Sequence, residues 1–347
     1  MFPDGRVPPK PPNWEAINQR LAQRRPSLSP FPEERFEEFV QADARANNED
    51  QVKDSVMPKL LAVGGAQRNI RFTNLAPLDG FKDDELKKAQ PDYYFGAPPE
   101  TLPPEIRNEL SKHIVPSTST HLPIAPNYFI EAKGPDGSLA VATRQACYDG
   151  AHGARAMQSL RSFRQSEPEY DNVAHTLSTI YHGGQVKIFS HSVAQPNGPG
   201  TLPVISMHQQ RSFALTDSEP SHVQGLTAVR NAADWAEEER NAGIMLARER
   251  ASQGAADNEG GIDEYAEEET EVEVEDDCEE SSSTMPSFSE VRTMSSLLDG
   301  DSDGSESSVD ELQCVPDELY PRKKRALSNS RHHHGKRKAG GRRSCGG

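Results

Sequence analysis

The sequence lacks an apolar run long enough to cross a membrane. No stretch of its 347 residues approaches the roughly 18 consecutive apolar residues that a transmembrane helix needs. The first residues, MFPDGR, also lack the apolar core of a signal peptide. Cysteine is scarce, and its positions (147, 278, 314 and 345) show neither zinc-site nor disulfide spacing. We therefore expect no membrane contact and a reducing compartment.

Apolar residues are also too few for the whole chain to pack as one globule. Only 34% of the residues are hydrophobic, and the net charge is −16. The composition predicts a disordered arm rich in proline and arginine over residues 1–30 and a folded domain over residues 31–252. Residues 253–347 are expected to form a disordered tail that is acidic over 263–311 and then basic over 321–343.

Helical and strand patterns alternate within residues 31–252, which predicts an α/β domain with a mixed central sheet. A helix should begin after Asn48 as N-cap, and Pro58 should kink or end it. The aromatic run before Glu131 predicts a buried strand, and residues 173–191 predict a hairpin. Small residues at steps of three and four after Ser138 predict a long helix close to the sheet, and residues 221–252 predict another.

Charged residues stand at the ends of two apolar runs, and their types suggest a catalytic site. Glu131 and Lys133 end the run Tyr-Phe-Ile, and side chains alternate along a strand, so both should lie on one face. Asp92 begins a second aromatic run and could supply another carboxylate from a neighbouring strand. Carboxylates suit Mg²⁺, which prefers oxygen ligands and is often held by one or two carboxylates with substrate phosphate. Lys133 would then position water and offset negative charge.

The pair Pro91-Asp92 followed by Glu131-Ala132-Lys133 resembles the signature of the PD-(D/E)XK, or restriction-endonuclease-like, superfamily. The stretch PNYFIEAKGPDGSLAVATRQACYDGAHGARAM is similar to an uncharacterised fungal domain family in that superfamily, and the resemblance extends over about residues 49–251. It implies a restriction-endonuclease-like core and Mg²⁺-dependent hydrolysis of nucleic-acid phosphodiester bonds. Asp92 and Glu131 would hold the metal.

Two further residues are carried over by the resemblance. Glu49, in the first helix, matches a metal-binding glutamate, although an acid in a first turn also stabilises the helix dipole. Gln145 matches a supporting glutamine on the helix after Lys133, whereas Tyr148 lies three residues later instead of four and is not carried over. The same polar stripe, which includes His152 and Arg155, could face a phosphate backbone or simply solvent.

Two other functions remain open from the sequence. The domain could be a catalytically weak or inactive nuclease-fold module that binds nucleic acid or protein. The chain could also be a nuclear scaffold whose acidic tail binds basic proteins such as histones. Two basic clusters near the C-terminus resemble a nuclear localisation signal for an importin-type receptor and predict a nuclear protein; their residues are Arg322, Lys323, Lys324, Arg325, Lys336, Arg337 and Lys338.

Overall fold

The structure is a computed structural model that describes residues 7–25, 32–61, 64–82, 86–168 and 170–259. The acidic stretch 263–311 and both predicted basic clusters lie outside these residues, as do most of the predicted tail and parts of the predicted N-terminal arm. The structure therefore leaves the localisation signal and the tail as predictions from sequence.

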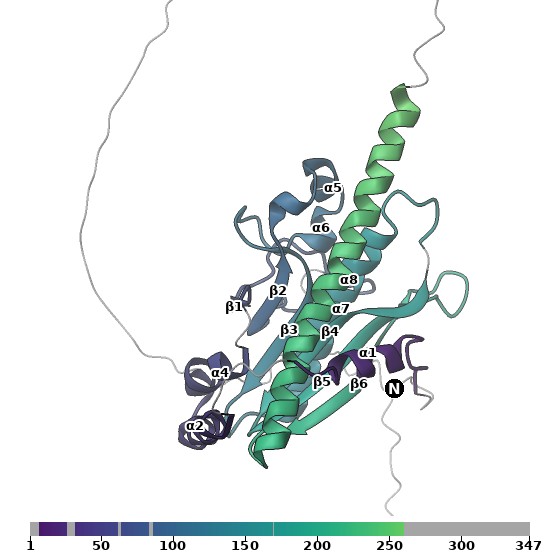
Figure 1. Cartoon of the computed structure of the whole chain (residues 1–347). Coiled ribbons are helices and arrows are strands. Elements are labelled where there is room, and N and C mark those ends of the chain that lie inside the picture. Colours follow the sequence, from purple (N-terminus) through teal and green to yellow (C-terminus); the bar gives the residue numbers. More distant parts are fainter. Residues whose placement is uncertain (1–6, 26–31, 62–63, 83–85, 169, 260–347) are drawn as a thin grey trace, which may run out of the picture. The chain divides into compact units, whose positions relative to one another are not determined.

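A six-stranded sheet lies at the centre of the described part, with strands in the order β1-β2-β3-β4-β5-β6. Neighbouring strands are antiparallel except β3 and β4, which are parallel and are joined by the crossover helix α7. Helices cover the sheet (Figure 1), so the predicted mixed α/β fold is confirmed. The strands are β1 (Gln67–Arg68), β2 (Tyr93–Ala97), β3 (Ile124–Lys133), β4 (Asp171–His182), β5 (Gln185–Ala194) and β6 (Val204–Ala214).

Helix α7 (Leu139–Arg161) packs closely on one face of the sheet because small residues line its contact stripe. Its N-cap is Ser138, as predicted, whose side chain accepts a hydrogen bond from the Val141 amide. A Cβ atom at Gly153 would lie 2.5 Å from the ring of Phe129 on β3. A Cβ atom at Gly150 would lie 2.1 Å from the ring of His191 on β5. Glycine at these two positions sets how near the helix can approach.

The opposite face of the sheet is covered mainly by α8 (Glu219–Glu259), which crosses the sheet in Figure 1, and α2 (Pro32–Arg45) packs against α8. Tyr128, Ile130 and Ala132 of β3 join this second core with Val229 and other apolar residues of α8. Side chains at alternate positions of β3 therefore belong to different layers, and Phe129 packs in a separate cluster with Phe72 and Tyr94. The remaining short helices are η2 (Pro99–Thr101), α5 (Pro104–Glu109) and α6 (Ser111–Ile114).

The expectation of a disordered N-terminal arm is wrong for one segment. Helix α1 (Trp14–Leu21) buries Ile17 and Leu21, four residues apart, in the same core as α8. The Asn13 side chain extends this contact, because its amide donates to Ala174 O at 2.8 Å and its oxygen accepts from Ala174 N at 3.1 Å. An apolar pair at helical spacing is enough to anchor a segment that is otherwise rich in proline and arginine.

The helix that begins after Asn48 does not end at Pro58. Asn48 caps it as predicted, accepting from the Gln51 amide at 2.9 Å. The run consists of α3 (Glu49–Gln51), the π-helical turn η1 (Val52–Val56) and α4 (Met57–Leu61). Proline lacks an amide donor and its ring crowds the carbonyl four residues earlier. The wider π-helical turn just before Pro58 lets the helical path continue.

Candidate functional site

Asp92 and Glu131 meet where β2 begins and β3 ends. Tyr93 pairs with Ile130 in the antiparallel register, which places Asp92 opposite Glu131. The Ala132 amide donates to Asp92 Oδ2 at 2.8 Å, and the Asp92 amide donates to Glu131 Oε1 at 3.3 Å. Each carboxylate is therefore oriented by a backbone N–H of the other strand's segment. Both lie on the α7 side of the sheet, the side to which Phe129 also points.

Lys133, at the end of β3, and Glu49, in α3, form an ion pair beside these two carboxylates. The Lys133 ammonium lies 3.3 Å from Glu49 Oε2, and its side chain is only 4% exposed. This contact depends on the close approach of α3 to the turn after β3. A Cβ atom at Gly134 would lie 2.6 Å from the Glu49 amide nitrogen, so a larger residue there would push the helix away. The structure thus brings together all three predicted carboxylates and the predicted lysine.

Lys53 is a member of the cluster that sequence reasoning missed. Its ammonium lies 2.6 Å from Glu49 Oε1 and 2.6 Å from Asp92 Oδ1. Burial alone would lower the pKa of Lys53, but the ion pairs and hydrogen bonds with Asp92 and Glu49 raise it above the ordinary value. The ammonium is therefore held charged. Its place four residues after Glu49 was a usable signal, although such pairs are usually solvent-exposed on a helix surface.

Asp149 on α7 is the second missed residue. It is 3% exposed, and burial, with the charge of Asp92, raises its pKa to about 7, although the hydrogen bond with Glu131 acts in the opposite direction. Burial and the charges of Asp92 and Asp149 also raise the pKa of Glu131, which hydrogen-bonds to Asp149. The raised pKa values favour a proton shared between Glu131 and Asp149. The sequence signal was an acid directly beside Gly150, within a stripe of small buried residues.

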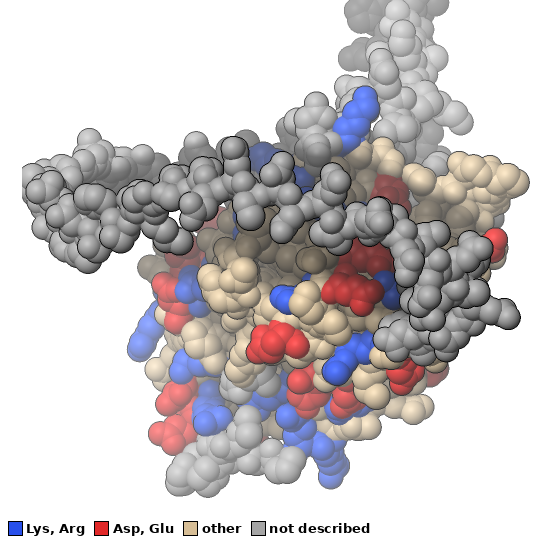
Figure 2. All heavy atoms as spheres, turned by 90° about the horizontal axis from the view of Figure 1, so that it is seen from above, with Lys and Arg blue, Asp and Glu red and all other residues tan. Residues whose placement is uncertain are grey.

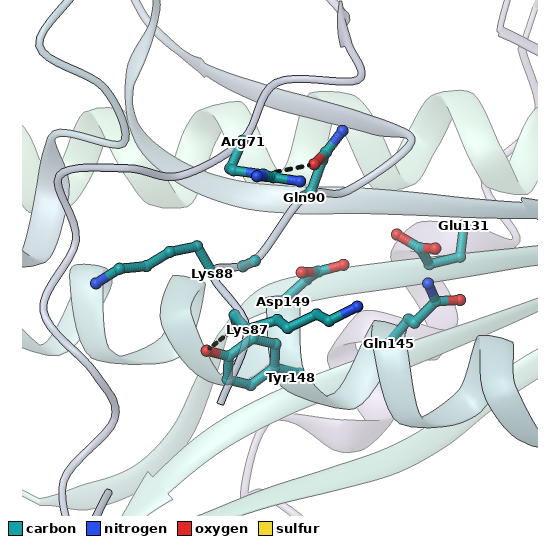
Figure 3. Close-up of a pocket in the computed structure, with 9 residues that line it drawn as sticks. Arg71, Lys87, Lys88, Gln90, Glu131, Gln145, Tyr148 and Asp149 are labelled. Atoms are coloured by element: carbon teal, nitrogen blue, oxygen red, sulfur yellow. Dashed lines mark hydrogen bonds between the residues drawn. The ribbon is translucent and has the colours of Figure 1, made fainter. Parts of the chain in front are cut away.

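A cavity of about 410 Å³ opens beside Glu131 and Asp149 (Figure 3). Gln145 and Tyr148 of α7 line the same side, so the predicted Gln145 does lie next to the carboxylates. The opposite wall comes from the segment before β2, where Arg71 donates to Gln90 Oε1 at 2.9 Å. Tyr148 ties the two walls together by donating from its hydroxyl to Lys87 O at 3.0 Å. Basic side chains on one wall are Arg71, Lys87 and Lys88.

The polar stripe of α7 is not a continuous surface for a phosphate backbone. His152 and Arg155 are buried, 3% and 8% exposed. The Arg155 guanidinium donates to Ala76 O at 2.6 Å and also to Pro77 O, so it anchors the chain before β2. The prediction that the stripe meets phosphate is therefore wrong for these two residues. Gln145 and Tyr148 face the cavity instead.

The donor set is chemically suited to a hard cation, but lysine ammonium groups lie among the carboxylates. Within the described residues, no three or more His, Cys, Asp or Glu side chains are arranged as a metal-binding group. The Lys53 ammonium lies between Glu49 and Asp92 and keeps these two carboxylates from sharing one ion. Oxygen ligands of this kind are those that Mg²⁺ prefers.

Charge on the surrounding surface is mixed. On the face shown in Figure 2, acidic and basic side chains of the described residues intermingle, with no broad patch of one sign. No helix in the part that the structure describes is both long and apolar enough to span a bilayer.

A family model described as a domain of unknown function, DUF7924, matches residues 36–247, more than half of the chain. The chain belongs to this family. The matched DUF7924 segment contains the entire cluster, from Glu49 to Asp149. No curated protein and no solved structure matches the chain. Because the family description carries no activity, a function has to be argued from the side chains themselves.

Proposed function

We propose that the chain is a metal-dependent nuclease of the PD-(D/E)XK type that hydrolyses nucleic-acid phosphodiester bonds. One observation carries the proposal: Asp92 and Glu131, far apart in the sequence, lie side by side, and the carboxylate of each accepts a hydrogen bond from a backbone amide of the other strand's segment. Lys133 lies at the same strand end, within 3.3 Å of Glu49. A proline-aspartate pair and a glutamate-x-lysine triplet are each common by chance. Their proximity in the fold supports a shared site.

Each side chain has a distinct role under this proposal. Asp92 and Glu131 would hold Mg²⁺, with Glu49 as a further ligand, and the ion when bound supplies electrostatic polarisation of the phosphate and a more acidic water. Lys133, nearly excluded from solvent, would hold the attacking water and offset charge on the phosphate. Gln145 would steady the carboxylates from α7. The basic wall of the cavity supports an anionic substrate.

Cleavage by the full chain tests the proposal. Plasmid, single-stranded DNA and RNA would each be incubated with the 347-residue protein in Mg²⁺, in Mn²⁺ and in EDTA. We expect cleavage only with the metal ions, and a loss of at least about 10²-fold in Asp92→Asn, because one charged ligand disappears. Thermal melting of the variant checks that it is folded.

Lys59→Ala is the matched control, because Lys59 forms an exposed ion pair with Glu38 and neither residue lines the cavity. It should cleave like the unmodified chain. Cleavage that persists in EDTA, or that is equal in Asp92→Asn, would come from another site or a contaminant and would refute the proposal.

One observation favours a second candidate, a nuclease-fold module that binds nucleic acid without cutting it. The Lys53 ammonium already neutralises Glu49 and Asp92 at 2.6 Å from each. If that lysine never leaves, the site needs no metal. Binding of an oligonucleotide that is unaffected by EDTA, together with no cleavage under any of the conditions above, would select this candidate.

The proposal extends to location through the basic clusters of the C-terminal region, Arg322–Arg325 and Lys336–Lys338. Clusters of this kind are typical of signals read by importin-type receptors, which would bring the chain to nuclear nucleic acid. Alanine at positions 322–325 should move a fluorescently tagged full chain out of the nucleus. An unchanged distribution would remove this part of the proposal.

A further inference from the structure

Lys53 occupies the place in the cluster where a cation is expected. Its ammonium is equidistant, at 2.6 Å, from one oxygen of Glu49 and one oxygen of Asp92. These two carboxylates come from different parts of the chain, a helix and the start of β2. A positive group that bridges them is chemically a stand-in for a metal ion, because both satisfy carboxylate oxygens from a single point.

The local backbone explains how Lys53 comes to point there. It lies in the π-helical turn η1, between the buried Val52 and the exposed Asp54. A π-helical turn inserts an extra residue and re-aims the side chains within it, and such turns occur frequently at functional sites. The Lys53 side chain is 14% exposed, so most of it is buried but part of it still contacts solvent.

The ion pairs with lysine also occupy the carboxylate oxygens that a metal ion would need. Glu49 Oε1 contacts Lys53 and Glu49 Oε2 contacts Lys133, so both of its oxygens are already paired. Asp92 Oδ1 contacts Lys53, while its other oxygen accepts from the Ala132 amide. One oxygen on each acid would become available to another cation if Lys53 moved away.

We infer that the divalent-cation position lies between Glu49 and Asp92, where the Lys53 ammonium now sits, and that cation binding expels Lys53. The inference rests on the proposed function and makes it specific, since Lys53 becomes an internal competitor of the metal. A binding-competent state that is only fractionally populated weakens apparent affinity by that fraction. Removing the competitor should therefore strengthen cation binding.

Mn²⁺ binding to the full chain tests this directly. The electron paramagnetic resonance signal of free Mn²⁺ would be titrated with the unmodified protein, Lys53→Met and Lys59→Met. We expect Lys53→Met to bind Mn²⁺ roughly tenfold more tightly or better than the unmodified chain, and Lys59→Met to bind equally. Lys59 is the matched control because it carries the same charge in the next helical segment and forms an ion pair with the exposed Glu38.

A second measurement uses the unmodified chain and so does not depend on how the variant folds. Acetylation of lysines by acetic anhydride, followed by mass spectrometry, reports how accessible each ammonium is. Acetylation of Lys53 should increase several-fold when Mn²⁺ is added, because the side chain moves toward solvent. Acetylation of Lys59 should be unchanged.

The outcomes separate this inference from the proposed function. If the unmodified chain binds Mn²⁺ and cleaves, but Lys53→Met binds no more tightly and Lys53 acetylation does not rise, only the inference is refuted. If neither chain binds Mn²⁺, both the inference and the nuclease proposal are refuted. If only Lys53→Met binds, the cation position is supported and the natural chain is the metal-free binding module.

Discussion

Two groups of buried polar side chains lie on the same face of the sheet, under α7, and they differ in charge. At the strand end, Asp92, Glu131, Asp149 and Lys133 are buried beside the partly buried Lys53. Near the middle of the sheet, His191 Nε2 lies 2.8 Å from Ser178 Oγ, and the His191 ring packs against Gly150 of α7. Burial lowers the pKa of His191 to about 3, so this second group is neutral.

This difference in charge indicates which of the two groups contributes to stability simply by packing the helix on the sheet. A neutral hydrogen-bonded pair contributes about 1 kcal/mol and fixes a helix against a sheet. Burying several ions gives little or no net stability, and apolar residues of similar size often do better. The His191–Ser178 pair therefore needs no function, whereas the charged cluster calls for one. The cavity adjoins only the charged group among these two, through Glu131 and Asp149.

The largest expected contrast is in activity. Lys133→Met should lower Mg²⁺-dependent cleavage by about 10²- to 10³-fold, because the ammonium at the strand end would no longer position water or offset charge. Ser178→Ala, which alters the neutral group on the same face, should stay within about threefold of the unmodified chain. Initial rates on one oligonucleotide measure both. Equal losses of cleavage rate in the two variants would show that the charged cluster has no special role in activity.

A smaller contrast is expected in stability, where the neutral group around His191 should matter. Gly150→Ala should destabilise the chain by roughly 1–3 kcal/mol, because the added methyl group would lie 2.1 Å from the buried His191 ring. Gly243→Ala is the control, because its methyl group would lie 3.0 Å from the flexible end of Met157 and in ordinary van der Waals contact with Leu160 and Arg161. Urea denaturation measures both free energies of unfolding. A Gly150→Ala chain as stable as its control would show that α7 does not depend on this contact.

A third contrast concerns pH. Because the pKa of Asp149 is raised to about 7 in the folded chain, against about 3.9 when unfolded, its neutral form favours folding at low pH. That contribution is complete below about pH 4 and is lost as the pH rises to about 7, by up to ~1.4 kcal/mol per pH unit. Without divalent cations, Asp149→Asn should lack this loss. Stability curves that run parallel in the two chains would contradict the shared proton.

Local patterns were sufficient to predict the main elements that carry the site. The aromatic run before Glu131 predicted β3, and the strand alternation correctly placed Glu131 and Lys133 on one face. The small residues after Ser138 predicted α7. These signals work because burial on one face of a strand or helix imposes a regular spacing on the sequence.

Residues placed by contacts between distant segments could not be predicted in the same way. Lys53 reads as a helix-surface lysine until α3 is seen to meet the turn at Gly134. Arg155 reads as part of a nucleic-acid surface until its guanidinium is seen bonded to Ala76 O. In both cases the long side chain has two plausible environments, and only the tertiary contact decides between them.

The most direct test of the charged cluster is anomalous X-ray diffraction from crystals of the full chain grown with Mn²⁺. We predict one anomalous peak between the carboxylates of Glu49 and Asp92, with the Lys53 ammonium displaced from its present contacts. Crystals that show no peak there, with Lys53 still bridging the two acids at saturating Mn²⁺, would contradict the account.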